Sequence, residues 1–293
     1  MDDRSLAALG FADVPAARPL TYPGRPVTAP TLLIGGELWD LEPAPGRLGT
    51  WPAGGPSREP LDALLTRLGQ APTGERHPVI AVGSNASPAQ LHHKLTRPDR
   101  PAVVPMVPVE VDGIAVGCSA HIGRYGYVAS APYTAPGTRT PLVVSWLDAA
   151  QLRAVDATEH PNYRRILLPG ADFPMVLPSG ERLGGGYLYV GVRGVLVSPD
   201  ATATATPLPG GGDQSALLTR LLAASRRLRA LLGPDPHTWV SRAGADPTIR
   251  KEGSQVFQDE GWALPQPAFL RYLEDETTGP AEPRGYDVLS ALR

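Results

Sequence analysis

The chain has 293 residues, a formal net charge of −2 and a hydrophobic fraction of 42%, the composition of a globular protein with a sizeable core. An isoelectric point near 6.3 and the absence of any run of Lys or Arg exclude a typical nucleic-acid-binding protein. The sequence has neither a signal-peptide pattern nor an apolar run of about 18 residues. It therefore predicts a cytoplasmic protein that makes no contact with membranes.

Cysteine and lysine are both rare in this chain. Cys118 is the single cysteine, so an internal disulfide is excluded and a thiolate zinc site is not expected. No spacing of His, Asp or Glu indicates a metal site either, and we expect no cofactor. Lys94 and Lys251 are the only lysines; this bias, with 34 prolines and 32 glycines, is typical of a GC-rich bacterial genome.

The first part of the chain, residues 1–77, is expected to be an N-terminal extension with one helix. Residues 1–27 are polar and rich in proline, which predicts an arm that lies over the surface. Residues 31–34 and 35–39 predict two short strands. Leucines recur at helical spacing over residues 60–69, and a glycine ends this run.

A strand followed at once by a helix comes next in the chain. Residues 78–82 are mostly apolar and β-branched, which predicts a buried strand, and the loop Gly83–Asn85 ends it. Ser87 as N-cap and Pro88 as the first helical residue then begin a helix. The loop therefore presents backbone N–H groups at the positive end of a helix dipole, which suits a carboxylate or a developing oxyanion.

The middle of the chain is rich in short β-type runs. Strands are predicted at residues 102–110, 114–120, 125–131, 142–146, 166–168, 173–177, 183–192 and 195–197. Asp112-Gly113 is a strong hairpin signal between the first two. Asp148 is the N-cap of a helix that ends at Glu159. Many short strands with few helices predict an α+β fold in which residues 78–198 form a small, mostly antiparallel β-barrel with flanking helices.

The C-terminal part of the chain is predicted to be helical. Residues 199–212 are of low complexity and form the expected linker. Residues 213–232 carry a leucine stripe at helical spacing, which predicts one amphipathic helix. Because an exposed stripe of this size would be unusual, we expect it to be buried. Residues 213–293 would then be a helical region packed on the barrel.

Two separated motifs carry a family resemblance. The loop Gly83–Asn85 is the core of a Gly-Ser-Asn motif after a strand, and Asp156–Glu159 is followed by Tyr163-Arg164. Together they resemble the γ-glutamylcyclotransferase superfamily, which has a Tyr-Gly-Ser-Asn-Leu loop and, downstream, a helix with Asp-x-x-Glu before a Tyr-Arg pair. The separation of 76 positions from Gly83 to Glu159 is one that this family uses. The resemblance covers about residues 78–195.

The resemblance implies an enzyme that needs no cofactor and releases 5-oxoproline from a γ-glutamyl amine or amino acid. The α-amine of the substrate attacks its own γ-carbonyl carbon, so proximity supplies up to roughly 10 kcal/mol of the barrier. A single buried carboxyl group can carry the protons. Glu159, at the end of its helix, is the candidate general acid/base. The alternative is a solvated glutamate, or one paired with Arg164 or Arg165.

Substrate binding is expected at the loop and at the strand that follows the helix. The candidate residues are Val82, Gly83, Ser84, Asn85, Ala86, Tyr163 and Arg164. The N–H groups of the loop would hold a carboxylate or the oxyanion, Tyr163 would donate a hydrogen bond, and Arg164 would bind a carboxylate through two N–H groups. A core role for Tyr163 and a surface role for Arg164 are the alternatives. Val82 and Ala86 depart from the family, which has an aromatic residue and leucine there.

Two other functions remain open. In the first, a non-enzymatic member of the same fold serves as a binding or scaffold module. In the second, an amidase or hydrolase uses Ser84 or Cys118 as its nucleophile. Cys118 and His121 stand three apart on a strand and would face opposite sides, which favours a buried structural thiol. The expected partner is a small γ-glutamyl compound, and a homodimer is the open alternative to a monomer.

Overall fold

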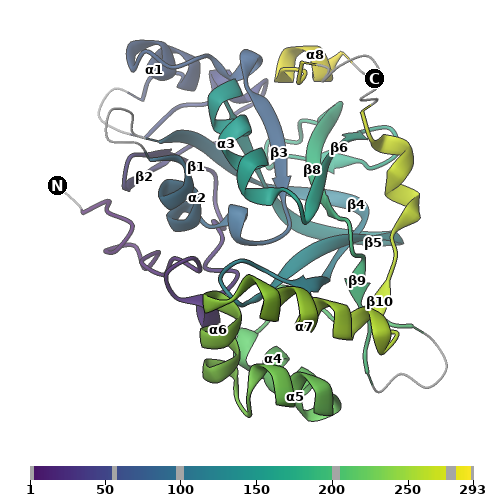
Figure 1. The fold of residues 1–293 in the computed structure, drawn as a ribbon. Helices are drawn as coiled ribbons and strands as arrows, with labels where there is room; N and C mark the ends of the chain where they lie inside the picture. Colours follow the sequence, from purple (N-terminus) through teal and green to yellow (C-terminus); the bar gives the residue numbers. More distant parts are fainter. Residues whose placement is uncertain (1–2, 55–57, 97–101, 200–204, 275–281, 292–293) are drawn as a thin grey trace.

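The computed structural model describes residues 3–54, 58–96, 102–199, 205–274 and 282–291. In these ranges one large, mostly antiparallel sheet is flanked by helices (Figure 1). The hydrogen-bonded strands follow the order β10-β9-β4-β5-β3-β8-β6, while β1 and β7 pair with β4 and β2 pairs with β1. The strands are β1 (Thr31–Ile34), β2 (Glu37–Asp40), β3 (His77–Ala81), β4 (Val103–Ile122), β5 (Val128–Leu147), β6 (Tyr163–Pro169), β7 (Met175–Val176), β8 (Gly185–Gly191), β9 (Val195–Leu196) and β10 (Ala263–Leu264).

The fold class predicted from the sequence is confirmed in its main features. The protein is a mixed α+β structure with several helices around a mostly antiparallel sheet. Closure into a barrel is not found, because the described strand order begins at β10 and ends at β6 without a pairing between them. The helices are α1 (Leu61–Arg67), α2 (Pro88–Leu95), α3 (Ala149–Glu159), α4 (Gln214–Ala224), α5 (Arg226–Leu232), α6 (Pro236–Ala245), α7 (Pro247–Asp259) and α8 (Tyr286–Ser290).

A long antiparallel pair, β4 with β5, forms the centre of the sheet. Each strand is 20 residues long, and their register shifts between Asp112 and Ile114, where Gly113 has a φ of 83°. The hairpin predicted at Asp112-Gly113 is therefore wrong. Both halves of β4 pair with the same β5, so β4 runs through Gly113 as one continuous strand and the chain turns only after Ile122. The extra residues lie in β5, where residues 135–138 are left unpaired opposite Gly113.

The strand β3 brings the Gly83–Asn85 loop to the centre of the molecule. It lies between β5, to which it is antiparallel, and β8, to which it is parallel, and all its residues are buried, as the apolar run predicted. Helices α2 and α3 contact each other over this part of the sheet, in a cluster that contains Leu91, Leu152 and Val155. Their packing places the C-terminal end of α3 beside the loop that follows β3.

The N-terminal arm, residues 3–30, contacts this loop and α2. The Val27 N–H donates to the Ala86 carbonyl (3.2 Å), and the Ala16 N–H donates to the Gln90 side-chain oxygen (3.3 Å). Tyr22 is only 6% exposed. The arm is therefore more than the surface cover that its proline content predicts, since one of its aromatic side chains enters the interior.

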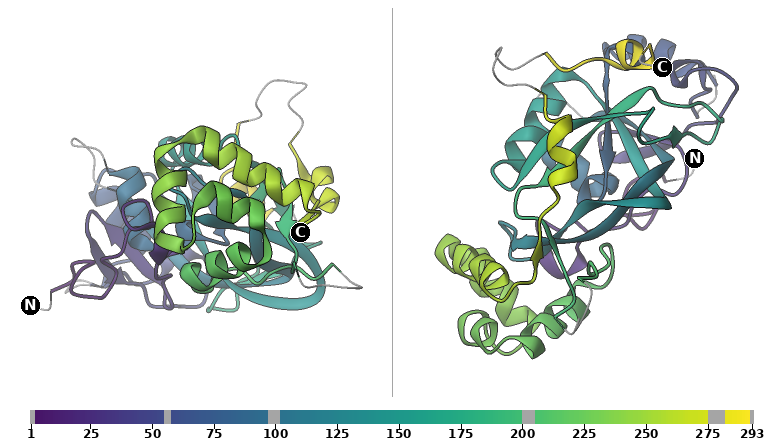
Figure 2. Two further views of the ribbon diagram at one scale, coloured as in Figure 1. Left: turned by 60° about the horizontal axis from the view of Figure 1, so that its bottom comes forward. Right: turned by 90° about the vertical axis from the view of Figure 1, so that its right-hand side faces the viewer.

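Helices α4 to α7 gather at one end of the sheet, as the two views of Figure 2 show. The single helix predicted at residues 213–232 is two helices, because Ser225 interrupts it: its side chain accepts the Leu228 N–H (3.1 Å) as the N-cap of α5. The leucine stripe packs in the core as predicted, with Leu217 and Leu231 only partly buried. Its most buried members, at most 3% exposed, are Leu218, Leu221, Leu222 and Leu228.

The expected linker, residues 199–212, is described only in part, since residues 200–204 lie outside the described ranges. Its later portion is attached to the sheet: the Leu208 N–H donates to the Leu196 carbonyl (2.8 Å), and the Cys118 N–H donates to the Leu208 carbonyl (3.0 Å). Among the helices in the described ranges, none combines the length and apolarity that a membrane span requires.

Ser254 attaches α7 to β4, and its replacement should destabilise the fold. Its buried Oγ accepts the Ile122 N–H (2.9 Å) and donates to the Arg250 carbonyl (2.7 Å). Ser254→Ala leaves a buried N–H unpaired and should lower the free energy of unfolding by about 1–3 kcal/mol. Thr219→Ala is the control, because that exposed hydroxyl donates only within its own helix, to Ser215. Equal losses of the two variants in urea unfolding would contradict this account.

Candidate active site

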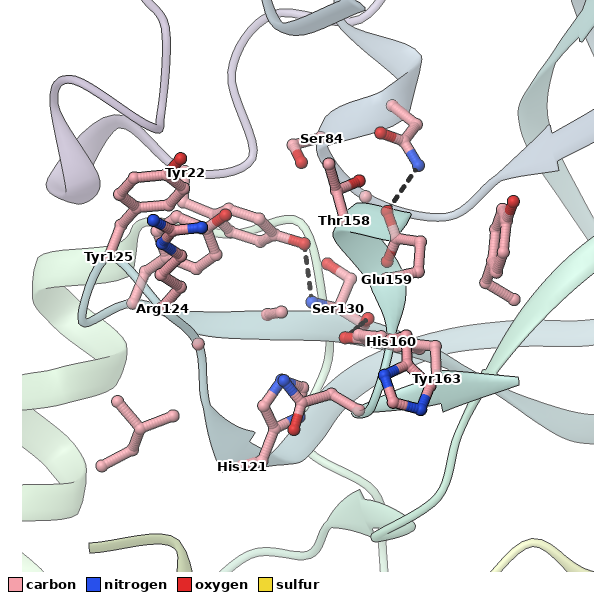
Figure 3. A pocket seen from close by; sticks show the side chains of 18 of the residues that line it. Tyr22, Ser84, His121, Arg124, Tyr125, Ser130, Thr158, Glu159, His160 and Tyr163 are labelled. Atoms are coloured by element: carbon pink, nitrogen blue, oxygen red, sulfur yellow. Dashed lines mark hydrogen bonds between the residues drawn. The ribbon is translucent and has the colours of Figure 1, made fainter. Parts of the chain in front are cut away.

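A cavity of about 600 Å³ lies where the Gly83–Asn85 loop, the end of α3, the turn between β4 and β5, and α7 meet. Its size suits a small-molecule ligand. The Tyr22 hydroxyl, Ser130 and Glu159 lie around its centre in Figure 3. Because its walls come from segments far apart in the sequence, the cavity exists only in the folded chain.

The loop after β3 offers backbone donors to this cavity. Ser84–Ala86 form a 3₁₀ turn, in which the Ala86 N–H donates to the Gly83 carbonyl (2.9 Å). Within the described ranges, the N–H groups of Ser84 and Asn85 have no protein acceptor. These two groups stand at the start of the turn, where a ligand anion can accept from them. Val82, Gly83, Ser84 and Asn85, four of the predicted substrate-binding residues, all line the cavity.

Glu159 ends α3, and its carboxylate contacts the loop. Its Oε1 accepts hydrogen bonds from Asn85 Nδ2 and from Lys94 Nζ, both at 3.0 Å, and Lys94 also donates to Asn85 Oδ1 (2.8 Å). The side chains of Lys94 and Glu159 are 12% and 15% exposed, so water screens this ion pair less than a surface pair. In the described chain Oε2 has no protein partner, which leaves it for a ligand.

The position of α3 explains why Glu159 reaches the loop. Asp148 begins the helix with a capping box to Gln151, as its N-cap assignment predicted. The alternative ion pair of Glu159 with Arg164 or Arg165 is not found. Arg165 instead contacts Asp156 (3.4 Å), whose other oxygen accepts a hydrogen bond from Tyr189 (2.6 Å).

Ser130 of β5 is held between two tyrosine hydroxyls. Its N–H donates to the Tyr22 oxygen, and its carbonyl accepts from Tyr163, both at 2.7 Å. Tyr22 also stacks on Tyr127, with ring centroids 4.3 Å apart. Burial raises the pKa of Tyr22 to about 12, so its hydroxyl is protonated at physiological pH. A side chain at Gly83 could not coexist with it, because a Cβ there would lie 2.4 Å from the Tyr22 oxygen.

Two of the predicted substrate-binding residues lie outside the cavity, and a third lines it with its hydroxyl already hydrogen-bonded. Arg164 does not line the cavity and is exposed, because adjacent residues of a strand point to opposite faces and Tyr163 takes the inner one. Ala86 does not line it either: it packs in the core cluster with α2, and its N–H is used within the turn. Tyr163 lines the cavity, but its hydroxyl is committed to Ser130.

His121 lies on the cavity wall as a neutral ring. Its Nδ1 is 2.6 Å from the Ser119 Oγ, and burial, with a smaller contribution from the charge of Arg193, lowers its pKa to about 3. Ser119 is fully buried and does not line the cavity, so this Ser–His pair offers no accessible nucleophile. Within the described residues, no cluster of three or more His, Cys, Asp and Glu could hold a metal ion.

Cys118 points away from His121, as the strand spacing predicted. Its thiol donates to the Pro209 carbonyl (3.3 Å) and lines a separate cavity of about 260 Å³. Burial raises the pKa of the thiol to about 12, which keeps it protonated and unreactive. These contacts support a structural role and argue against a cysteine nucleophile.

Sequence reasoning missed most of the cavity wall. The missed residues include Tyr22, Lys94, His121, Arg124, Tyr125, Tyr127, His160, Arg193, Arg250 and Lys251. Most of them come from the N-terminal arm, the β4–β5 turn or α7, none of which carries a recognisable motif. One signal was present: both lysines of the chain line this cavity.

Comparisons with known proteins bear on the fold. No protein-family model and no curated protein matches the chain. Similar solved structures include one titled γ-glutamyl cyclotransferase, 14% identical, which covers 40% of this chain and 67% of that one with a TM-score of 0.33. A yeast γ-glutamyl cyclotransferase specific to glutathione is 12% identical over 61% of this chain and 99% of that one, with a TM-score of 0.28. An uncharacterized human protein is 12% identical over 73% and 98%, with a TM-score of 0.32.

The superfamily that the two motifs resemble is thus found among the structural neighbours. All of these TM-scores lie below 0.5, so the chemistry of the site rests on its own geometry.

The close approach of Tyr22 to Gly83 should appear as coupling between the two positions. Gly83→Ala pushes a methyl group against the Tyr22 hydroxyl and should lower the free energy of unfolding by about 1–3 kcal/mol. In the Tyr22→Phe background that clash is absent, so the double variant should lose less than the sum of the single variants, by about 1 kcal/mol or more. Gly212→Ala, which adds a methyl group in open space, is the control. Strict additivity in urea unfolding would refute the contact.

His121 should make the protein less stable in acid. The folded chain holds its pKa near 3, against 6.5 for an ordinary histidine, so below about pH 6.5 the unfolded state binds one more proton. Stability from this group is therefore lost as the pH falls from 6.5 towards 3, at up to about 1.4 kcal/mol per pH unit. Urea unfolding at several pH values should show a shallower acid slope for His121→Asn. His93→Asn, at an exposed position on the same cavity, should keep the wild-type slope; parallel curves for wild type and His121→Asn would contradict the assignment.

Proposed function

We propose that this protein is a γ-glutamylcyclotransferase-like enzyme, which releases 5-oxoproline from a γ-glutamyl amine or amino acid without a cofactor. The observation that carries the proposal is the placement of Glu159. Its carboxylate faces the same cavity as the unpaired N–H groups of Ser84 and Asn85, and it is hydrogen-bonded to Asn85. A proton carrier and an anion site therefore face the same space, in which one carbonyl group could react.

In the proposed reaction Glu159 carries the protons. Oε2 accepts one from the substrate α-ammonium, and the freed amine attacks the γ-carbonyl carbon to form the C–N bond of the lactam. The attacking nitrogen loses a second proton after this bond has formed. Both protons end on the leaving nitrogen, carried in turn by Glu159, as the C–N bond to the amine breaks. No water and no acyl-enzyme takes part, because the nucleophile belongs to the substrate.

Three donors are available to the oxyanion of the tetrahedral intermediate. The backbone N–H groups of Ser84 and Asn85 point from the start of the 3₁₀ turn, and the protonated Tyr22 hydroxyl lies against Gly83. Donors that are fixed before the reaction stabilise developing charge without reorganisation. Lys94 holds Asn85 and Oε1 of Glu159 together, so it fixes the orientation of the carboxylate.

The two alternative functions have less support. A scaffold has no need for a shielded carboxylate in an open cavity, whereas Glu159 occupies that position. A hydrolase that used Ser84 would need a base bonded to its hydroxyl, and no such bond exists within the described part of the chain. Cys118 lies outside the cavity with a protonated thiol.

Glu159→Gln should abolish 5-oxoproline release while the chain still folds. Glutamine keeps the shape of the side chain, and its oxygen can accept from Asn85 and Lys94, but it cannot take up and return a proton. We expect kcat to fall by roughly 10² to 10⁴ with KM nearly unchanged. The measurement is 5-oxoproline release from a panel of γ-glutamyl amino acids.

Cys118→Ala is the matched control, because the proposed reaction has no covalent intermediate. It should retain wild-type kcat. Wild-type turnover by Glu159→Gln, together with an inactive Cys118→Ala variant, would replace the acid/base mechanism by a thiol nucleophile.

A further inference from the structure

The cavity wall carries much more positive charge than the chain as a whole. The net charge of the chain is −2. In contrast, the cationic side chains on the wall are Lys94, Arg124, Arg193, Arg250 and Lys251, against one carboxylate, that of Glu159. Lys94 pairs with Glu159, so the other four cations are left without a counter-charge inside the cavity.

None of these four cations forms an ion pair with a carboxylate in the described ranges. The charge of Arg193 reaches His121, whose pKa it helps to lower. Arg250 donates through Nη1 to the carbonyls of Ala243 (2.7 Å) and Gly244 (3.3 Å), which fixes its guanidinium at the end of α6. Lys251 is the next residue on α7, exposed and without a protein hydrogen bond in the described chain.

These cations come from other segments of the chain than the groups assigned to the γ-glutamyl half. Arg250 and Lys251 are on α7, and Arg193 is in the turn between β8 and β9. Arg124, in the turn between β4 and β5, lies on the opposite side of the cavity from Glu159 in Figure 3. A ligand whose carbonyl group lies at the Gly83–Asn85 loop has room in the same cavity to extend its other end towards these side chains.

We infer that Arg124, Arg193, Arg250 and Lys251 form a second subsite that binds an anionic group on the leaving amine. The inference rests on the proposed function, since it concerns the half of the substrate that is released. The substrate class is then a γ-glutamyl compound whose amine carries a carboxylate or a phosphate. Charge-assisted hydrogen bonds favour such an amine, while a cationic amine such as a polyamine is repelled.

Matched substrate pairs test this subsite. The first pair is γ-glutamyl-aspartate and its diamide, which differ only in the charge of the amine half. The second pair is γ-glutamyl-phosphoethanolamine and γ-glutamyl-ethanolamine, and a comparison of the two pairs separates phosphate from carboxylate. We expect kcat/KM of the wild-type protein to be at least roughly tenfold higher for the charged member of at least one pair, a difference of about 1.4 kcal/mol.

Charge-removing variants show whether the named cations are responsible. Lys251→Gln and Arg193→Gln should each raise KM for the charged compound by roughly tenfold and leave the neutral compound unchanged. Arg226→Gln removes the same charge from α5, at an exposed position that does not line the cavity, and should behave as wild type. If all three variants behaved alike, or if the neutral members were turned over as well as the charged ones, the subsite would be refuted while the cyclotransferase activity stood.

Calorimetric binding of the same compounds separates the two proposals when turnover fails. If no compound releases 5-oxoproline, the proposed function is refuted, and the subsite is then decided by affinity alone. Tighter binding of the charged member, lost in Lys251→Gln and Arg193→Gln, upholds it. Equal binding of both members overturns it.

Discussion

The pairing of β4 with β5 is the constraint on which the rest of the structure depends. The two long strands remain paired on both sides of the register shift opposite Gly113. As a result, the same pair of strands packs against two different hydrophobic cores. The first half of β4 also pairs with β1 and carries the core shared with α1. The second half holds the C-terminal helices. The site lies at the end of this pair of strands, where both approach their turn, so its geometry follows from the pairing.

The functional groups of the cavity come from segments that are far apart in the sequence. The β3 loop supplies backbone donors, α3 supplies the carboxylate and α2 supplies the lysine that orients it. The N-terminal arm adds a hydroxyl, and α7 adds positive charge. Each of these groups alone says little about the chemistry of the site. Together they form a site in which one carboxylate oxygen is fixed and the other is free, which is what a proton carrier needs.

The parts of this arrangement that the sequence predicts are those encoded within short stretches. The β3 strand, its Gly-Ser-Asn loop and the capped helix ending at Glu159 depend on neighbours within a few residues, so pattern and capping identify them. Arg164 lies outside the cavity although the motif places it beside Tyr163, because adjacent residues of a strand point to opposite faces. Asp112-Gly113 has the local chemistry of a turn, yet pairing with a common partner strand overrides it.

Long-range contacts account for what could not be predicted. The contacts that bring Tyr22 and α7 to the cavity span 108 and 132 residues. No motif near either segment in the sequence predicts that it lines the cavity. The same holds for Arg250 and Lys251 of α7. In the sequence they resemble the charged residues of any solvated helix face, and only the tertiary fold places them in the same cavity as Arg193.

Because α7 docks on β4 late in the chain, the walls of the cavity form in a definite order during synthesis. Domains generally fold as units as the chain emerges during synthesis, N-terminal part first, and contacts between distant residues form slowly. The loop, the lysine of α2 and the glutamate of α3 all precede α7 in the chain by many residues. A nascent chain can therefore bring the loop, Lys94 and Glu159 together before α7 has been made, and the cavity then stays open to water until α7 docks on β4.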